Sequence, residues 1–419
     1  MDVYRRGARV RPGPLWGGHL AATQLALGGV AIAAADECRH FKFIGTTGTG
    51  KSTAIRSLLA GALGRGDRAV VSDPDGGYTA EFLRPLRGDV LINPFEPGSR
   101  SWDLFGELQD DYDSEQLASA LIANSADSAG QEWRGYARTL LSAVLRWCRQ
   151  RPSRSLDELW RLLAIASHEE LRAVVAGTSA QPFLEPENAR MLGSIRSVML
   201  SAMSALEHVR AQRAAPLSIR AWVRGGHGAL FMPYRAGQIA ALRGVIAAWL
   251  RLAIFEALHA RPGDQRLWFI VDELDALGAI DGLKDALARL RKYGGRCVLG
   301  FQSVAQVSGT YGAAEAQTLI ENCGNTLILR CAGSENGGTS QFASRLIGER
   351  EVRRRQVTRS NDRGAGLSGG TRRSRQVSVQ QLTETAVLAS ELEQLPDLTG
   401  YLKLASARCW RRVRLRREA

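Results

Sequence analysis

A glycine-rich run near the amino terminus has the residue types and spacing of a phosphate-binding loop. Residues 41–55, FKFIGTTGTGKSTAI, contain the pattern G-x-x-x-x-G-K-[ST] between an apolar, strand-like run and an apolar, helix-like run. Glycines let successive backbone amides point at a phosphate, and the following helix N-terminus and lysine add positive charge. We therefore predict a nucleotide-binding loop made of Gly45, Thr46, Thr47, Gly48, Thr49, Gly50, Lys51, Ser52 and Thr53.

Two carboxylates at the end of a much later apolar run complete the chemistry of a hydrolysis site. Residues 267–271, LWFIV, read as a buried strand, and Asp272 and Glu273 follow directly. We expect Asp272 to hold Mg²⁺ through water, together with the hydroxyl of Ser52. Glu273 would polarise the attacking water as a general base, while Lys51 neutralises phosphate charge. The pattern predicts an ATPase that uses ATP and Mg²⁺.

Polar residues end three further apolar runs, where parallel sheets place their ligands. Gln302 follows the run 297–301 and is our candidate for sensing the γ-phosphate. Arg330 follows 326–329 and either reaches the nucleotide of a neighbouring subunit or makes a local ion pair. Asp73 follows 69–72 and either orients the phosphate loop and metal waters or caps a turn.

A basic cluster at the end of a predicted helix has two explanations of similar weight. Cations compensate the dipole at a helix C-terminus, and they also bind the phosphates of a nucleic acid. The net charge of +13 and the pI of about 10.0 favour an anionic partner, either nucleic acid or an acidic membrane surface. The candidate nucleic-acid contacts are Arg289, Arg291, Lys292 and Arg296.

The composition is that of an ordinary globular protein. At 419 residues with 45% hydrophobic residues, the chain is long enough for two domains. The six cysteines are scattered without a C-x-x-C pair, which favours reduced thiols over disulfides or a zinc site. The most apolar stretch, 15–35, contains His19, Thr23 and Gln24, and is too polar for a membrane span. We expect a soluble chain, or one whose membrane anchor lies outside this sequence.

The order of patterns predicts an α/β fold interrupted by helices. A hairpin at 25–32 and strands at 69–72 and 89–93 flank the phosphate loop and its helix, and strand patterns resume near 228. Helical periodicity dominates between them. We therefore expect a mostly parallel sheet built from residues 1–104 and 213–419, with an all-α domain at 105–212.

Two segments near the carboxyl end have their own patterns. The stretch 350–375 is rich in Arg, Ser and Gly, which predicts flexible chain or a loop ordered only in an assembly. It contains 366–370, close to G-x-S-x-G, but the missing preceding strand argues against a hydrolase elbow. Residues 400–404 and 409–415 are predicted to pair as edge strands.

Several of these stretches together carry a family resemblance. The phosphate loop, Asp73-Pro74-Asp75-Gly76, Asn93-Pro94, 269–274, 301–303 and 395–398 resemble, in order and spacing, the type IV coupling proteins of the TraD/TrwB kind. The resemblance implies a RecA-like ATPase domain with an all-α insert, assembled as a hexameric ring on the cytoplasmic side of the bacterial inner membrane. It also implies ATP-driven passage of single-stranded DNA, or recruitment of relaxase and other substrates, to a conjugative secretion channel with its own ATPases and inner-membrane components.

Two alternative functions use the same ATPase core but differ in what ATP hydrolysis does. One is a chromosome-processing DNA pump of the FtsK/HerA kind. The other is a substrate receptor whose ATPase is only regulatory and whose binding is done by the helical domain.

Overall fold

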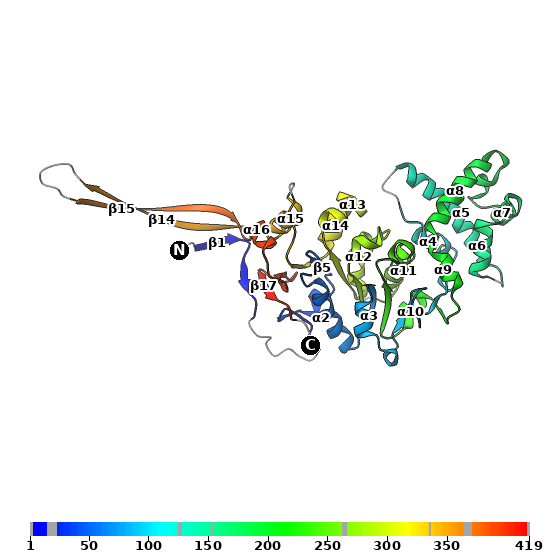
Figure 1. The fold of residues 1–419 in the computed structure, drawn as a ribbon, viewed down its shortest axis with the longest axis horizontal. Coiled ribbons are helices and arrows are strands. Elements are labelled where there is room, and N and C mark those ends of the chain that lie inside the picture. The colour runs from blue at the N-terminus through cyan, green and yellow to red at the C-terminus, as the bar shows by residue number, and fades with distance from the viewer. Residues whose placement is uncertain are drawn as a thin grey trace.

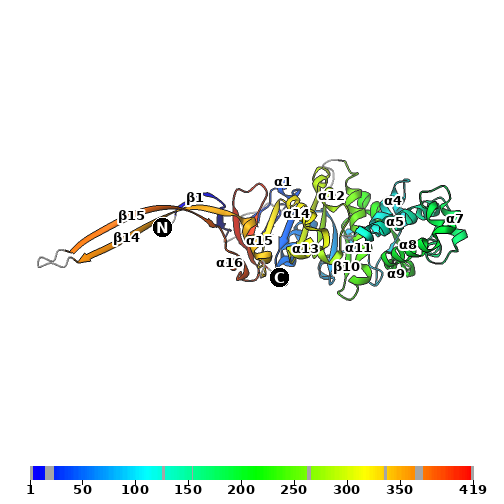
Figure 2. The ribbon, with the colours of Figure 1, turned by 90° about the horizontal axis from the view of Figure 1, so that it is seen from above.

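The molecule is elongated, with helices at one end and a two-stranded ribbon at the other (Figures 1 and 2). It is a computed structural model. The structure describes residues 3–14, 23–124, 128–152, 154–261, 266–334, 337–363 and 371–416.

A ten-stranded sheet forms the centre, in the order β2-β17-β16-β13-β5-β12-β11-β6-β10-β7. The strands from β13 to β7 run parallel to one another, β16 is antiparallel to both of its neighbours, and β2 is parallel to β17. The predicted α/β class with a mostly parallel sheet is therefore confirmed. The strands are β2 (Val10–Pro12), β5 (Phe41–Ile44), β6 (Arg68–Pro74), β7 (Val90–Leu91), β10 (Ala229–Tyr234), β11 (Leu267–Val271), β12 (Gly295–Phe301), β13 (Asn325–Ile328), β16 (Thr399–Lys403) and β17 (Trp410–Arg414).

The central strands are apolar because both faces of the sheet are covered. Along β11, Trp268 and Ile270 pack into one hydrophobic core, while Phe269 and Val271 pack into the other. The first core lies under α2 (Lys51–Gly64) and the hairpin of β3 (Ala26–Leu27) and β4 (Val30–Ala31), as predicted for 25–32. The helices of the other face include α11 (Ile239–Ala257), α12 (Leu283–Leu290), α13 (Val304–Tyr311) and α14 (Ala313–Asn322).

The remaining short elements connect the sheet to its surroundings. They are α1 (Ala34–Glu37), α3 (Gly77–Phe82), α10 (Ile219–Gly225), α15 (Gly338–Ile347) and α16 (Ala389–Glu393).

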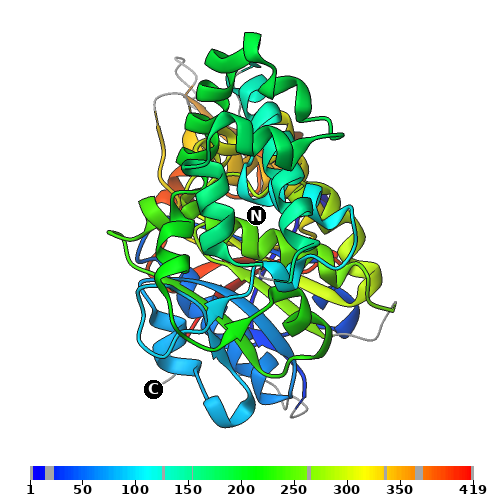
Figure 3. The same cartoon turned by 90° about the vertical axis from the view of Figure 1, so that its right-hand side faces the viewer.

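The described residues between 105 and 212 contain helices and no strand. Ser155 caps one helix by accepting a hydrogen bond from Glu158 N. Residues 189–211 form two helices, with a break at Met203 and Ser204. Figure 3 looks onto this end of the molecule. The helices are α4 (Asp113–Leu121), α5 (Ser128–Arg149), α6 (Leu156–Ala164), α7 (His168–Val175), α8 (Ala189–Ala202) and α9 (Ala205–Ala211).

The expectation of flexible chain at 350–375 is wrong for the described part of that stretch. β14 (Glu349–Arg363) and β15 (Thr371–Thr385) pair antiparallel over their whole length, and β1 (Val3–Gly7) joins β14 near its base. Backbone hydrogen bonds pair these two strands, whose sequence is mostly polar, so hydrophobic periodicity gave no signal for the ribbon. The 366–370 motif lies outside the described residues.

The two strands expected at the carboxyl end do pair, as β16 and β17. They are not at the sheet edge, however, because β2 from the amino terminus adds to β17. A three-residue strand containing arginine and proline is too short for periodicity to reveal.

One buried carboxylate joins the two chain segments that enter and leave the helical region. The parallel pair β8 (Ser101–Trp102) and β9 (Pro216–Leu217) brings both ends of the helical region together. Beside this pair, Glu107 is fully buried and accepts hydrogen bonds from Trp102 Nε1 at 2.9 Å and Ile219 N at 2.6 Å. It also accepts from Arg220 N and Ser218 Oγ. Burial raises the pKa of Glu107, and the hydrogen bonds from Arg220 N, Trp102 and Ile219 N offset only part of that rise.

We predict that Glu107→Ala lowers the free energy of unfolding by about 3 kcal/mol, because buried donors lose their acceptor. Thermal and urea unfolding measure this change. The control Glu187→Ala, at an exposed position, should shift stability by no more than about 0.5 kcal/mol. Equal effects of the two variants would show that Glu107 does not hold the junction.

Candidate active site

The phosphate loop connects β5 to α2 and depends on glycine at three positions. Gly48 and Gly50 have φ angles of +77° and +115°, which favour glycine. At Gly45, a Cβ atom would lie 2.9 Å from Leu329 Cβ, so the loop passes against the neighbouring strand end too closely for a side chain. The conformation expected from the motif is therefore present.

Lys51 lies at the start of α2 and is buried beneath the loop. Its Nζ donates to the carbonyl oxygens of Gly45 at 2.6 Å and Thr46 at 3.1 Å. Burial lowers the pKa of Lys51, and the charges of Asp272 and Glu273 oppose that shift. The ammonium group is thus aimed at the loop's interior, where a phosphate oxygen would be a stronger, charged acceptor.

Asp272 connects the two halves of the sequence motif. Ser52 Oγ donates to its Oδ2 at 2.9 Å, and the hydroxyl of Tyr78 donates to the same oxygen at 2.8 Å. The other oxygen, Oδ1, is buried and has no hydrogen-bond partner among the described residues. A buried, unpaired carboxylate oxygen beside a serine hydroxyl fits a hydrated Mg²⁺, since Mg²⁺ retains waters and prefers oxygen ligands.

Glu273 is linked to the phosphate loop through Gln302. Gln302 Nε2 donates to Glu273 Oε1 at 3.0 Å, and Thr47 Oγ1 donates to Gln302 Oε1 at 2.9 Å. Burial raises the pKa of Glu273, and the neighbouring charge of Asp272 adds to the shift. Glu273 also has a φ of +60°, which is uncommon for a residue other than glycine. Such strained backbone conformations cluster at functional sites.

These groups surround a single pocket of about 680 Å³. Its walls bring together the sequence-predicted residues Thr47, Lys51, Ser52, Asp272, Glu273 and Gln302. The arrangement can bind a polyphosphate, hold a divalent cation and place a carboxylate beside the reacting phosphate.

Comparisons with known proteins identify the family. The family model described as "Type IV secretion-system coupling protein DNA-binding domain" matches residues 24–416. The chain belongs to this family of coupling proteins. The family resemblance noted in the sequence is therefore confirmed.

Individual relatives support the same assignment. Coupling protein TraD of Escherichia coli (strain K12) is 30% identical over 395 residues, which are 91% of this chain and 53% of TraD. This coupling protein therefore spans about half the length of that relative. The solved structure of the conjugative coupling protein TrwBdeltaN70 in its unbound form has a TM-score of 0.86 and 31% identity, covering 100% of this chain and 94% of that chain.

Other solved structures extend the comparison. TrwB in complex with ADP and Mg²⁺ also has a TM-score of 0.86 and 31% identity, covering 99% of this chain and 94% of that chain. VirB4 of Thermoanaerobacter pseudethanolicus, with 16% identity and a TM-score of 0.58, shares the fold alone. Within the described part of the coupling protein, no helix is both long and apolar enough to cross a membrane.

Several residues around the pocket were not predicted from the sequence. Tyr78 is buried and contacts Asp272, while Arg56, Leu398 and Arg416 line the pocket. The Asp-Pro-Asp-Gly motif was the available signal for Tyr78, because it marks a strand end at the nucleotide edge of the sheet. Leu398 and Arg416 come from the far end of the chain, where no local pattern indicates contact with the loop.

Asp73 was predicted either to orient the phosphate loop and metal waters or to cap a turn, and in the structure it is a cap. Its carboxylate accepts from Tyr78 N at 3.0 Å and Thr79 N at 2.6 Å, as a cap at the start of α3 does. It thereby fixes the helix that carries Tyr78.

Arg330 makes the local ion pair that was one of its two alternatives. Its Nη2 lies 2.7 Å from Asp397 Oδ1, and its backbone oxygen accepts from Thr46 N at 2.9 Å. Both contacts lie within one subunit, beside that subunit's own phosphate loop.

The prediction that Arg296 contacts nucleic acid is wrong. Its side chain is buried, and Nε lies 2.9 Å from Glu37 Oε2 while the guanidinium stacks over Trp268. Arg289, Arg291 and Lys292 are exposed and remain candidate phosphate contacts. They lie just before β12 begins, at the sheet edge opposite the nucleotide pocket.

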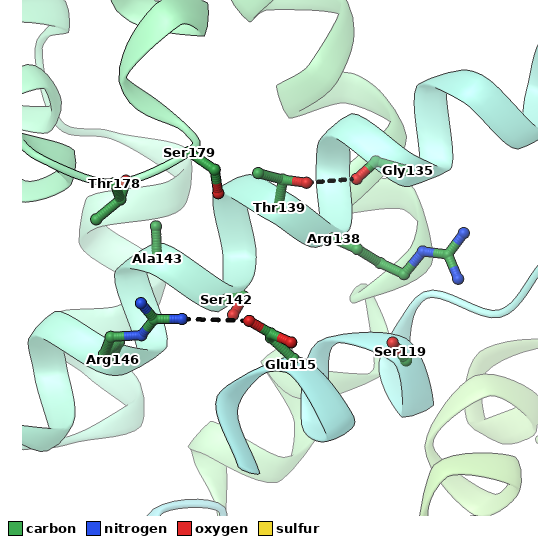
Figure 4. A pocket seen from close by; sticks show the side chains of 10 residues that line it. All are labelled: Glu115, Ser119, Gly135, Arg138, Thr139, Ser142, Ala143, Arg146, Thr178 and Ser179. Atoms are coloured by element: carbon green, nitrogen blue, oxygen red, sulfur yellow. Dashed lines mark hydrogen bonds and ion pairs between the residues drawn. The ribbon is translucent and has the colours of Figure 1, made fainter. Parts of the chain in front are cut away.

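A second hollow lies among the insert's helices, far along the chain from the phosphate loop (Figure 4). Hydroxyl groups of α5 and of the turn at Thr178 and Ser179 line it, and Arg146 approaches Glu115 at 3.4 Å. Ser142 Oγ is buried there without a partner among the described residues. The hollow is polar and contains no counterpart of the carboxylate pair in the nucleotide pocket.

We predict that Tyr78→Phe weakens Mg²⁺ binding by about tenfold, because Asp272 loses one of its two orienting donors. Titrating Mg²⁺ while following the affinity for a fluorescent nucleotide measures the effect. Affinity in EDTA should be unchanged. Tyr136→Phe is the control, since that hydroxyl contacts Glu132 on the surface of α5; the same Mg²⁺ shift in both variants would refute the role of Tyr78.

Proposed function

We propose that this coupling protein binds ATP with Mg²⁺ and hydrolyses ATP to drive secretion. The observation that carries the proposal is the connected set of hydrogen bonds around one pocket. It runs from Ser52 to Asp272, and from Thr47 through Gln302 to Glu273. The TrwB structures with ADP and Mg²⁺ and with the ATP analogue ADPNP support the choice of nucleotide.

Each side chain has one task in this mechanism. Lys51 neutralises charge on the phosphates, and the loop's amides bind their oxygens. Glu273 accepts a proton from the attacking water at its carboxylate, and its raised pKa makes it a stronger base than an ordinary glutamate. Gln302 holds Glu273 in place and, through Thr47, links its position to the phosphate loop. Ser52 and Asp272 would hold a hydrated Mg²⁺, which when bound would stabilise the negative charge of the phosphates.

The hydrolysis would move single-stranded DNA, or a DNA–protein complex, toward a conjugative secretion channel. The net charge of +13 and the family assignment support DNA as the cargo. By the family resemblance we propose a homo-hexamer at the cytoplasmic side of the inner membrane. Its further partners would be relaxase or other substrates, secretion ATPases and inner-membrane components. The family match favours this purpose over a chromosome pump of the FtsK/HerA kind.

The second candidate is a substrate receptor whose ATPase is only regulatory. The polar hollow in the helical region favours it, because it offers arginine and hydroxyl groups away from the nucleotide pocket (Figure 4). In this case the helices bind the substrate, and ATP turnover does not depend on DNA.

We predict that single-stranded DNA stimulates steady-state ATP turnover, with the rate per subunit rising with protein concentration as the ring assembles. Lys51→Ala should lower turnover by at least about a hundredfold while leaving DNA affinity unchanged, because a buried phosphate contact is lost. Lys284→Ala, on α12, is the matched lysine control. If DNA does not change the rate of ATP turnover under conditions in which the ring assembles, the substrate receptor is favoured. Normal turnover by Lys51→Ala would disprove the assigned site.

We predict that the acidic limb of the kcat–pH profile has its midpoint above the ordinary glutamate pKa of 4.5, because burial raises the pKa of Glu273. Below that midpoint the base is protonated and turnover falls. Glu273→Gln should remove turnover but retain nucleotide binding, measured with a fluorescent analogue. A Glu273→Gln variant that keeps the wild-type profile would assign the limb to another group.

A further inference from the structure

The phosphate loop is held at both ends by segments distant in sequence. Near its start, Thr46 N donates to Arg330 O at 2.9 Å, and the Thr46 hydroxyl approaches the same oxygen at 3.3 Å. Near its end, Leu398 N donates to Thr49 O at 2.9 Å. The loop is therefore anchored on two sides by backbone groups outside its own strand and helix.

The side chain of Arg330 joins these two anchors. Its Nη2 lies 2.7 Å from Asp397 Oδ1, and its Nη1 donates to Leu395 O at 3.3 Å. Asp397 directly precedes Leu398. The contacts therefore close a ring that runs from the loop to Arg330, across the ion pair to Asp397 and Leu398, and back to the loop.

The packing around Leu398 shows how closely the second anchor approaches. A Cβ atom at Gly50, whose φ is +115°, would lie 2.8 Å from Leu398 Cδ2, so Leu398 packs directly against the loop. Leu398 has a φ of +60°, a conformation that persists in a leucine only when its surroundings hold it. The hydrogen bond from Leu415 N to Leu398 O, at 2.7 Å, supplies part of that support from the end of the chain.

Leu398 also lines the nucleotide pocket, beside Arg416. Movement of this segment would therefore change both the shape of the phosphate loop and a wall of the pocket.

We propose that Arg330, Asp397 and Leu398 form a clasp that fixes the phosphate loop of their own subunit in its nucleotide-binding shape. Arg330 and Asp397 are positioning residues, and Arg330 is not a catalytic finger for a neighbour. The proposal rests on nucleotide binding at this loop. It gives the Leu-Pro-Asp-Leu stretch of the sequence a physical task.

The test separates nucleotide affinity from the rate of chemistry. Asp397→Ala and Arg330→Ala should each raise the KM for ATP by about twofold to fivefold, as expected for a partly exposed ion pair, with kcat within about twofold of wild type. The double variant R330D/D397R should restore most of the lost affinity. Glu185→Ala breaks a similar partly exposed pair with Arg172 in the helical region and should leave the KM unchanged.

A catalytic finger acting between subunits gives the opposite results. Arg330→Ala would then lower kcat by orders of magnitude, Asp397→Ala would be neutral, and the charge swap would not restore activity. In mixed assemblies of wild type and Arg330→Ala, a clasp within each subunit predicts that each subunit keeps its own KM and kcat, so that the activity is the sum of the wild-type and variant contributions. A finger instead predicts that variant subunits also inactivate their wild-type neighbours. A large loss of kcat in Arg330→Ala, or inactivation of wild-type neighbours in mixed assemblies, would overturn the clasp.

Equilibrium binding of a fluorescent ADP analogue gives a readout that does not need turnover. The single variants should weaken binding by the same factor as the KM, and the swap should restore it. This separates failure of the clasp from failure of the proposed ATPase function, since a protein that hydrolyses nothing still reports its affinity. Thermal unfolding of each variant checks that the fold is intact, and Asp397→Asn serves where Asp397→Ala is unstable.

Discussion

The hydrogen bond between Ser52 and Asp272 joins residues 220 positions apart in the chain, and the nucleotide site depends on it. It exists because parallel strands deliver their carboxyl ends to one edge of the sheet. β5 leads into the phosphate loop, β11 ends at Asp272 and Glu273, and β12 lies between them and ends at Gln302. The order of these three strands in the sheet therefore places the side-chain amide of Gln302 between the phosphate loop and the two carboxylates.

β12, which lies between β5 and β11, needs a residue without a side chain where the carboxylate of Asp272 lies against it. A Cβ atom at Gly300 on β12 would lie 2.6 Å from Asp272 Oδ1, so a side chain there would displace the oxygen assigned to the metal waters. Asp73 acts on the same carboxylate from the other side, because it caps the helix that presents Tyr78. The position of Asp272 is therefore fixed by groups on β12, α2 and α3 together.

The sequence was most informative where the physical signal is local. The phosphate loop, the buried strands and the Asp-Glu pair each depend on neighbouring residues, and the structure places them as expected. Errors arose where a side chain's partner is distant. Arg296 looked like a surface cation at a helix end. It is instead buried in an ion pair with Glu37, which lies more than 250 residues earlier in the chain. The ribbon of β14 and β15 escaped prediction because backbone pairing between polar strands leaves no apolar period.

The separation of the sheet into two sequence segments has a mechanical consequence. β5, β6 and β7 come from the first segment, but β5 lies between β12 and β13 of the second, and β6 lies between β11 and β10. Neither segment can complete its hydrogen bonds or cover its apolar faces alone, so the helical region must allow both to meet before a site exists. The closed pair β8 and β9 makes this possible, because it returns the chain to the place where it left the sheet. The last strands then contact the first loop through Leu398, so the phosphate loop near residue 50 takes its final shape only when the carboxyl end has folded onto it.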